Sequence, residues 1–594
     1  MLFRSPLLGG DAKGETVSAT FLKRNPGLLL ETRLFDKGFT AELLASFGSL
    51  DDALTGVVVR SENLQGLRFL AARYGASVDA VYIDPPYNTD ASPIVYKNGY
   101  QRSSWASAIA DRLHADRVLR KPRALRCVAI DDFEHPDLRL ILDAEPGSQQ
   151  HGTAVVRSKP QGRPTTSGFS PNHEYALFFG PPDGVVGRLP RSGSKAERYP
   201  HSDSSGIFAW ANLRKSGTDS ARADRPKSYY PIYVSRDDAV RIPRMQWDKP
   251  TERWNVEEPP RADEVVVWPV DTSGDDRVWN CSPERLREEI ADVRVIREGN
   301  VQITKKYRPH QGGALPGTWW DDPAYSASES GTKTIKDMFA AKDFDYPKSV
   351  NLVVDCLRAA GLQPGGLALD YFGGSGTTAH AVINLNREDE GRRKFILVEV
   401  NDYFESVLLP RILKATYAKD WKDGKPVAAA PVPGGALYKV LYLESYEDTL
   451  ANLALPAEGT QAGLFTGALH REYVVRYLLD RETKGAHLDL DRFRRPFGWT
   501  MEVRRGGLVE AGHPIDLVET FNYLIGLTVR RVGHFISPDT VRYVKGSVRE
   551  GGDTRKVLVL WRDCDAVSDA TLARYFQDRE FAPVASREIG RAHV

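Results

Sequence analysis

The chain of 594 residues lacks several features that define whole classes of protein. It has only four cysteines and no Cys-x-x-Cys pair, which excludes a disulfide scaffold and argues against a structural zinc site, so no metal is expected. No apolar run approaches the roughly 18 residues of a membrane-spanning helix. The first residues, MLFRSPLLGGDAKGE, lack the apolar core and cleavage site of a secretory signal. We therefore expect a cytoplasmic protein without membrane contact.

The chain also lacks an excess of charge, since 80 Lys and Arg face 79 Asp and Glu. A net charge of +1 gives no sign of a polyanionic partner, but the total averages over domains. Residues 151–244 alone hold 15 basic and 8 acidic side chains, a net charge of +7, interleaved with aromatic residues. Basic side chains neutralise phosphates, and arginine can read guanine edges, so this stretch is expected to contact nucleic acid. Its basic residues include Arg157, Lys159, Arg163, Arg188, Arg214, Lys215, Arg222, Arg225 and Lys227.

Short apolar runs alternate with helix-spaced apolar residues in two separated parts of the chain, 41–180 and 345–430. The alternation predicts a parallel α/β sheet that the two parts complete together. The expected strands are 57–59, 78–83, 125–130, 175–179, 366–370 and 395–400.

The alternation fails in residues 181–344, which are rich in Pro, Gly, Ser, Arg and Trp, so this region is expected to be an insertion. Residues 1–40 are expected to form an N-terminal extension and 431–587 a C-terminal α+β region. The last residues, 588–594 (EIGRAHV), back-translate into a common sequencing-adapter read, and we expect them to be an artefact.

The first expected site follows the apolar strand 78–83, where the chain reads Asp84-Pro85-Pro86-Tyr87. An amine on a heteroaromatic ring is a poor nucleophile, because its lone pair is delocalised into the ring. Activation needs hydrogen-bond acceptors aimed at both of its N–H groups. The Asp84 carboxylate and the Pro85 carbonyl, held rigid by the ring of Pro86, could supply them. Tyr87 offers a face on which a flat base can stack.

The second expected site is a glycine-rich turn between a strand and a helix, DYFGGSGTT at 370–378. Glycines allow a ligand to approach the backbone, and the helix N-terminus offers unpaired N–H donors. Glu399 ends the following strand, where a carboxylate can accept hydrogen bonds from ribose hydroxyls. Residues 374–379 also fit G-x-G-x-x-A, which leaves a nicotinamide-dependent dehydrogenase open. No Lys follows the glycines in a GK[ST] arrangement, so a P-loop is excluded.

The two motifs together resemble those of the amino-methyltransferases that modify DNA bases with S-adenosylmethionine. DPPY at 84–87 resembles their catalytic motif, and D-x-F-x-G-x-G at 370–376 their cofactor motif. The catalytic motif comes first, as in the circularly permuted β group of these enzymes. The resemblance implies a Rossmann-like methyltransferase sheet with an inserted target-recognition domain. It assigns Asp84, Pro85, Pro86 and Tyr87 to catalysis, and to the cofactor Asp370, Phe372, Gly374, Ser375, Gly376, Thr377, Glu399 and Lys348.

From about residue 40 to about 565 the chain further resembles the Mod subunits of type III restriction–modification systems. There are departures: Tyr371 and Gly373 stand where Pro and Ala are frequent, and Ser61-Glu62-Asn63 replaces the more usual Gly-Asp/Glu-Asn. The second departure is expected to alter the pocket near the active site. The segments that carry this resemblance are 208–217, 224–226, 230–233, 331–333, 344–349 and 443–450.

The resemblance implies methyl transfer from S-adenosylmethionine to N6 of an adenine flipped out of double-stranded DNA. It also implies a homodimer and a helicase–nuclease (Res) partner, with the C-terminal region contributing to both contacts. Asp84 favours adenine, because Ser is more frequent in the cytosine enzymes. N4-cytosine methylation, an orphan methylase without a nuclease partner, and a non-catalytic specificity subunit stay open beside the dehydrogenase.

Overall fold

The computed structural model describes residues 28–32, 35–88, 101–162, 168–191, 197–310, 312–340, 344, 346–452, 494–505, 508–535, 537–550 and 552–576, besides residues 20 and 23. The chain divides into two compact units. The sheet unit comprises Met1–Gly187 and Pro316–Val594, and the inserted unit comprises Arg188–Leu315. The insertion is therefore shorter than the expected 181–344, because its last part belongs to the sheet unit. Arg163 and the expected artefact at 588–594 lie outside the described residues.

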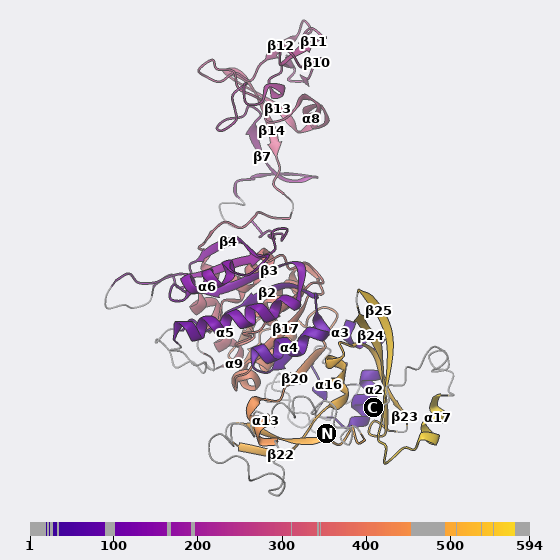
Figure 1. The fold of residues 1–594 in the computed structure, drawn as a ribbon. Helices are drawn as coiled ribbons and strands as arrows, with labels where there is room; N and C mark the ends of the chain where they lie inside the picture. Colours follow the sequence, from indigo (N-terminus) through magenta and orange to yellow (C-terminus); the bar gives the residue numbers. More distant parts are fainter. Residues whose placement is uncertain are drawn as a thin grey trace. The chain divides into compact units, whose positions relative to one another are not determined.

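A nine-stranded sheet forms the centre of the sheet unit (Figure 1). Neighbouring strands pair in parallel, except that β5 runs antiparallel to both β3 and β4. The expectation of a parallel sheet thus fails at this one strand. Periodicity could not reveal it, because strand direction depends on the connections. In spatial order the strands are β15 (Trp319–Trp320), β4 (Gln149–Val156), β5 (Glu174–Gly180), β3 (Arg120–Ile130), β2 (Val78–Ile83), β16 (Leu367–Asp370), β17 (Lys394–Glu399), β1 (Gly56–Arg60) and β20 (Tyr438–Tyr442).

The two separated α/β parts of the chain meet at the pair β2–β16, where Ala80 faces Ala368 and Val81 faces Leu369. The expectation that they complete one sheet is confirmed. Because β2 and β16 are parallel neighbours, their carboxyl ends, Ile83 and Asp370, lie at the same edge of the sheet. This adjacency brings the two sequence motifs together, although they are almost 300 residues apart.

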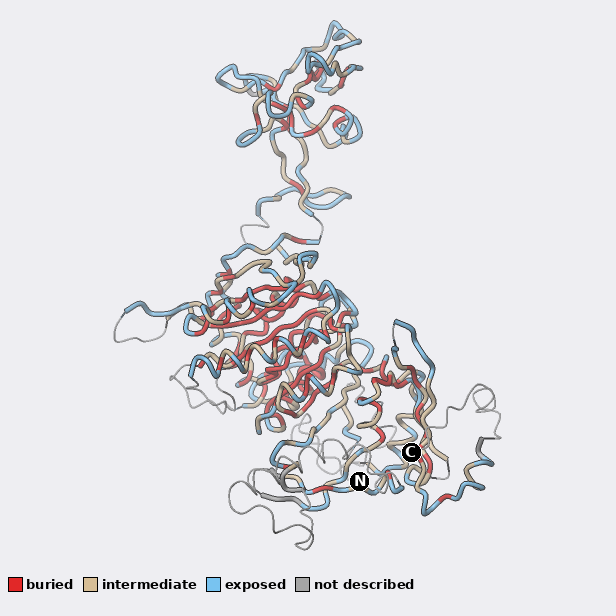
Figure 2. Tube along the Cα trace, viewed as in Figure 1, coloured by how far each residue is buried: buried red, intermediate tan, exposed pale blue. Residues whose placement is uncertain are grey.

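Helices cover this sheet and bury its apolar strands, which form the core seen as a red band in Figure 2. The helices α4, α5 and α6 pack against one another in sequence, and so do α10, α11 and α12. The apolar side chains of α4, α5 and α6 form one cluster with the sheet. The bounds are α4 Asn63–Tyr74, α5 Arg102–Ala115, α6 His135–Asp143, α9 Lys333–Phe339, α10 Val350–Ala359, α11 Thr377–Asp389 and α12 Leu409–Tyr417.

The C-terminal region begins inside this sheet rather than beside it, because β20 pairs with β1. The expected boundary at residue 431 is corrected accordingly. Beyond β20, helix α16 (Leu517–Leu524) and the antiparallel sheet β23–β24–β25 pack with the N-terminal helices α2 (Lys37–Ala45) and α3 (Leu50–Ala53). The remaining bounds are β23 Thr528–Phe535, β24 Val541–Glu550, β25 Asp553–Arg562, β18 Trp421–Lys422, β19 Lys425–Pro426, α13 Tyr446–Asn452, β21 Thr500–Arg505, β22 Leu508–Pro514 and α17 Asp569–Phe576.

Buried Asp51 fastens the C-terminal region to the sheet. Its carboxylate lies 2.7 Å from Arg73 of α4 and 3.4 Å from Lys439 of β20, and it accepts the backbone N–H of Val529 at 2.6 Å. Only 4% of its side chain is exposed. This one carboxylate therefore links α4 and β20 of the sheet to β23 of the C-terminal region.

The inserted unit is built from small antiparallel sheets around a core that includes Tyr230, Val234 and Trp279. Residues 188–315 carry 23 basic and 20 acidic side chains, a net charge of +3. The basic stretch 151–244 spans both units, but most of its excess belongs to this one, because residues 188–244 hold 12 basic and 6 acidic side chains. Residues 245–315, with 11 basic and 14 acidic side chains, lower the total of the unit. The bounds are β6 His201–Asp203, β7 Gly206–Asn212, β8 Ile232–Ser235, β9 Val240–Arg241, β10 Met245–Asp248, β11 Arg253–Val256, β12 Glu264–Val267, α8 Pro283–Glu288, β13 Val293–Glu298 and β14 Asn300–Tyr307.

In the part of the chain that the structure describes, no helix is both long and apolar enough to span a bilayer.

Candidate active site at the carboxyl edge of the sheet

Asp84 leaves the end of β2 and meets a lysine from a distant part of the chain. Its Oδ1 lies 3.2 Å from Nζ of Lys348, which precedes Ser349, the N-cap of α10. Burial and the nearby charge of Glu174 raise the pKa of Asp84, while Lys348 opposes this rise. The lysine therefore favours the ionised carboxylate, the form that accepts hydrogen bonds.

Lys348 also contacts a second acid and the motif's tyrosine. Its Nζ lies 2.6 Å from Glu174 Oε2 and 4.6 Å from the centre of the Tyr87 ring, and it donates to the Tyr87 hydroxyl. Tyr87 in turn donates to Glu174 at 3.1 Å. Burial, with the neighbouring acids, raises the pKa of Tyr87 well above its usual value. One cation between two carboxylates thus holds Asp84 and Tyr87 in place.

The second half of the motif is fixed by its neighbours. The Pro86 carbonyl accepts the indole N–H of Trp105, a buried residue of α5, at 2.9 Å. Asn88, with a φ of 56°, donates to Glu134 at 2.7 Å. The turn after β2 is therefore held by side chains from two other segments.

Asp370 shapes the glycine-rich turn from within. Its carboxylate accepts the Phe372 backbone N–H at 3.0 Å and the Thr378 hydroxyl at 2.5 Å, and only 3% of the residue is exposed. Burial raises the pKa of Asp370 to about 7, against these two hydrogen bonds. Asp370 therefore joins the start of the turn to the first residues of α11.

Glu399, which ends β17, holds the turn from the other side. Its Oε2 accepts the Gly374 N–H at 2.7 Å, and its Oε1 accepts the backbone N–H groups of Val400 and Asn401 at 2.9 and 3.0 Å. Gly374 and Gly376 have φ angles of 53° and 82°, in the left-handed region that side chains rarely adopt. These glycines let the turn reach the Glu399 carboxylate.

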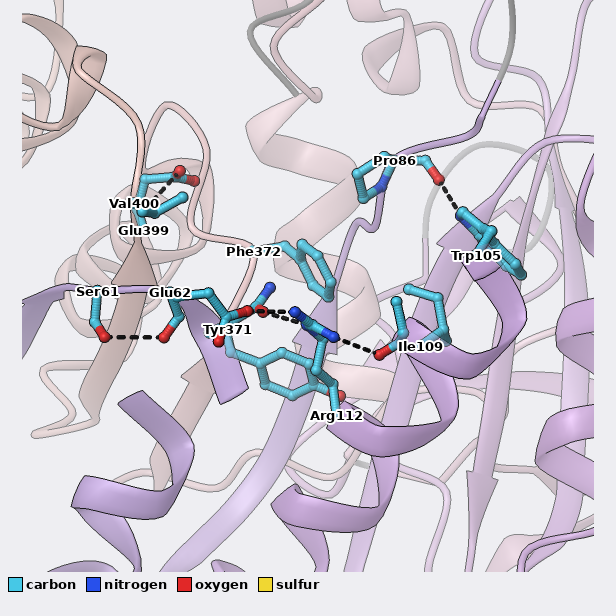
Figure 3. Close-up of a pocket in the computed structure, with 12 residues that line it drawn as sticks. Ser61, Glu62, Pro86, Trp105, Ile109, Arg112, Tyr371, Phe372, Glu399 and Val400 are labelled. Atoms are coloured by element: carbon cyan, nitrogen blue, oxygen red, sulfur yellow. Dashed lines mark hydrogen bonds and ion pairs between the residues drawn. The ribbon is translucent and has the colours of Figure 1, made fainter. Parts of the chain in front are cut away.

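A cavity of about 210 Å³ opens between the two motifs (Figure 3). A single ordered water needs roughly 10–15 Å³, so the cavity is large enough for part of an organic ligand. Of the residues that the sequence assigns to the site, Pro86, Phe372 and Glu399 line it. The other lining residues are Ser61, Glu62, Asn63, Trp105, Ala108, Ile109, Arg112, Tyr371 and Val400.

The departure at Ser61-Glu62-Asn63 lies in the wall of this cavity. Arg112 of α5 reaches across and donates to both Glu62 and Asn63, as Figure 3 shows for Glu62. Glu62 also caps α4 by accepting the Gln65 N–H at 3.1 Å.

Four residues of the site belong to neither sequence motif and were not predicted from the sequence, namely Glu174, Trp105, Arg112 and Arg411. The acid Glu174 begins an apolar strand, an unusual place for a buried charge, and this could have served as a signal. Arg411 lies in the first turn of amphipathic α12, where only its position between apolar residues marks it.

Lys348 is placed differently from the expectation. The resemblance assigned it to the cofactor, but its ion pairs are with Asp84 and Glu174, at the catalytic motif. Of the remaining expected cofactor residues, Ser375 and Thr377 accept hydrogen bonds from buried Arg411.

Together these residues define an α/β protein of Rossmann-like architecture, with a ligand pocket at the carboxyl ends of adjacent parallel strands. The profile of a family described as DNA methylase (N6_N4_Mtase) matches residues 78–409, more than half of the chain. The chain belongs to this DNA methylase family. Membership leaves no place for the dehydrogenase alternative.

Curated relatives share this similarity. The chain is 29% identical over 388 residues to the EcoPI Mod subunit of a type III restriction–modification enzyme from Escherichia phage P1, covering 58% of this chain and 57% of that protein. It is 30% identical over 374 residues to the type II methyltransferase M.KpnI of Klebsiella pneumoniae, covering 61% and 84%. It is 26% identical over 372 residues to the StyLTI Mod subunit of Salmonella typhimurium, covering 57% and 51%. The alignments thus span little more than half of each Mod subunit.

Proposed function

We propose that this protein is a site-specific DNA methyltransferase that uses S-adenosylmethionine to methylate N6 of adenine. The observation that carries the proposal is the adjacency of β2 and β16. It brings Asp84, held by Lys348, to the same sheet edge as the glycine-rich turn and its cavity. Family membership supports the reaction class.

Catalysis by this chain rests on positioning and electrostatics. The ionised Asp84 carboxylate accepts one N–H of the target amine and the Pro85 carbonyl accepts the other, so that the nitrogen lone pair is directed out of the ring's conjugation. S-Adenosylmethionine would supply the methyl group and leave as a neutral thioether, and the surplus proton of the methylated amine would pass to solvent. Lys348 keeps Asp84 ionised. Lys348 Nζ lies over one face of the Tyr87 ring, so the base would stack on the other face.

The residues around the cavity fit S-adenosylmethionine, which supplies an electrophilic methyl group when bound. Phe372, Ile109 and Val400 offer apolar surface for a flat heterocycle, and Glu399 stands at the carboxyl end of β17, where the proposed ribose contact would form. The glycine-rich turn reaches the cavity through Tyr371 and Phe372, and α11 begins directly after the turn. The proposed set of cofactor residues is Asp370, Phe372, Gly374, Ser375, Gly376, Thr377 and Glu399.

The target adenine lies inside a duplex, so the proposal requires that it be flipped out. The inserted unit is the candidate for reading the sequence, because it carries exposed basic residues such as Arg225 and Lys227. Others of its arginines are engaged: Arg222 lies 3.0 Å from Asp276, and Arg241 lies 2.6 Å from Glu264. The exposed residues are therefore the candidate phosphate contacts.

We further propose that the protein acts as the Mod subunit of a type III-like system in the cytoplasm, as a homodimer with a helicase–nuclease partner. Similarity to the EcoPI and StyLTI Mod subunits supports this role. Similarity to M.KpnI, a type II methyltransferase, supports the alternative of a methyltransferase that has no helicase–nuclease partner. Co-purification from the native host distinguishes the two.

The proposed reaction is tested on whole-genome-amplified DNA, which carries no methylation and contains every short recognition sequence. After incubation with S-adenosylmethionine, mass spectrometry of the digested DNA should show N6-methyladenine. An Asp84→Ala variant should bind DNA with unchanged affinity and give no product. Finding only N4-methylcytosine would overturn the adenine assignment, and equal lack of product from the wild type and the variant would favour a non-catalytic specificity subunit.

A further inference from the structure

A fully buried arginine stands behind the glycine-rich turn without an acidic partner. Arg411, in α12, has no exposed surface. Its Nη1 donates to Ser375 Oγ at 2.6 Å and to Thr377 Oγ1 at 2.8 Å. Its Nη2 has no hydrogen-bond partner among the described residues. Burial lowers the pKa of Arg411 to about 9, with no carboxylate opposing the shift.

An unpaired buried guanidinium is unusual, since buried charges are ordinarily paired. The other fully buried arginine among the large side chains, Arg126, shows the ordinary pattern, with Asp116 at 2.6 Å and Glu145 at 2.7 Å. Arg411 Nε also donates to Nδ1 of buried His380 at 3.5 Å. Burial and the charge of Arg411 lower the pKa of His380 well below its usual value. The positive charge at Arg411 is therefore not neutralised by the described chain.

Arginine also sets the direction of the hydroxyl groups that it contacts. A guanidinium only donates, so Ser375 and Thr377 must present lone pairs to it and turn their own hydrogens elsewhere. The two hydroxyl oxygens are 3.3 Å apart, so one can donate to the other, and one O–H remains to donate outward. Chains of this kind strengthen along their length.

The hydroxyls stand at the N-terminus of the 13-residue helix α11. Its N-cap is Gly376, which has no side chain to accept the N–H groups of the first turn. Helix N-termini favour anions, and here an uncompensated cation and two oriented hydroxyls act in the same direction.

We propose that Arg411 is a positioning residue that, through Ser375 and Thr377, selects the carboxylate at the amino-acid end of the cofactor. This inference rests on the proposed use of S-adenosylmethionine, whose only anionic group is that carboxylate. Arg411 does not touch the ligand; it orients the hydroxyl donors and supplies the charge that favours an anion at the turn.

The test is calorimetric binding of two ligands to the full chain. S-Adenosylhomocysteine carries the carboxylate, and its decarboxylated analogue lacks that group alone. The Arg411→Met variant should bind S-adenosylhomocysteine about ten-fold more weakly, a change of about 1.4 kcal/mol. Its affinity for the decarboxylated analogue should change less than about two-fold, and Arg411→Lys should retain part of the discrimination.

Lys414 is the matched control, because it is a second buried cation on α12 whose partners, the carbonyls of Met338 and Gly424, lie away from the turn. Lys414→Met should leave the ratio of the two affinities unchanged. An equal loss for both ligands in Arg411→Met, or no loss for either, would overturn the inference. If Arg411→Met does not fold by circular dichroism, Ser375→Ala takes its place with the same selective loss expected. A wild type that binds neither ligand would instead overturn the proposed function, and this inference with it.

Discussion

Replacing Lys348 with methionine should raise the pKa of Asp84 and move the acidic limb of the methylation pH profile upward. Lys348 Nζ lies 3.2 Å from Asp84 Oδ1, and its charge is the leading influence that opposes burial. At an effective dielectric constant of ~20, two unit charges at this distance interact by about 5 kcal/mol. That energy corresponds to roughly 4 pKa units, an upper bound because water entering the vacated space would solvate the carboxylate. We expect a shift of at least about one unit.

The matched variant Glu174→Gln should act in the opposite direction. The charge of Glu174 raises the pKa of Asp84, so its removal should lower that pKa and move the acidic limb downward. The assay is single-turnover transfer of a labelled methyl group to unmethylated genomic DNA between pH 5 and pH 9, with both variants checked for DNA binding. Shifts in the same direction, or an unmoved limb in Lys348→Met, would refute the account of Lys348 as the group that keeps Asp84 ionised.

Three further outcomes are expected. Asp370→Asn removes a carboxyl group whose pKa burial raises to about 7 in the folded protein, so the wild type loses stability as the pH rises towards that value and the variant does not. Urea unfolding should therefore show the variant gaining about 2–3 kcal/mol relative to the wild type between pH 5 and pH 8. A difference that stays constant over this range would contradict the raised pKa of Asp370. Asp51→Asn should lower the free energy of unfolding by about 3 kcal/mol, since it leaves the largely buried Arg73 without its carboxylate, while Lys439 keeps its ion pair with Glu519. Exposed Asp52→Asn should cost less than about 1 kcal/mol, and equal effects of the two variants would count against the Asp51 link. Arg225→Glu should weaken DNA binding and reduce the slope of log affinity against log salt concentration by about one unit, as measured by fluorescence anisotropy. The control is Arg285→Glu, which should change neither quantity, because Arg285 of α8 already pairs with Glu289, the C-cap of that helix.

The features of this protein that depend on local chemistry could be predicted from the sequence. Apolar runs of strand length and helix-spaced apolar residues predicted β1, β2, β16 and β17 and the helices between them, because burial imposes a period on each element. The two motifs were likewise visible, since DPPY and the glycine-rich turn are contiguous and have few other uses. Their resemblance to a known family led to the class that the family comparison then showed.

Only the tertiary structure decided which groups meet around those motifs. Lys348, expected at the cofactor, lies instead between Asp84 and Glu174, and Glu174 itself had no motif to mark it. Similarly, Arg411 reaches Ser375 and Thr377 from 34–36 residues away. Such contacts depend on how strands and helices from separate segments pack, which no local pattern encodes.

The same reason explains the expectations about strand direction and domain boundaries that the structure corrected. The antiparallel direction of β5, the pairing of β20 with β1 and the shorter insertion are set by chain connections and by the burial of strand edges, not by composition. The sequence by itself therefore determined the chemistry that the chain carries at its two motifs. The fold determined the charges that surround Asp84 and the glycine-rich turn, because electrostatic interactions act across space between residues that are distant in the chain.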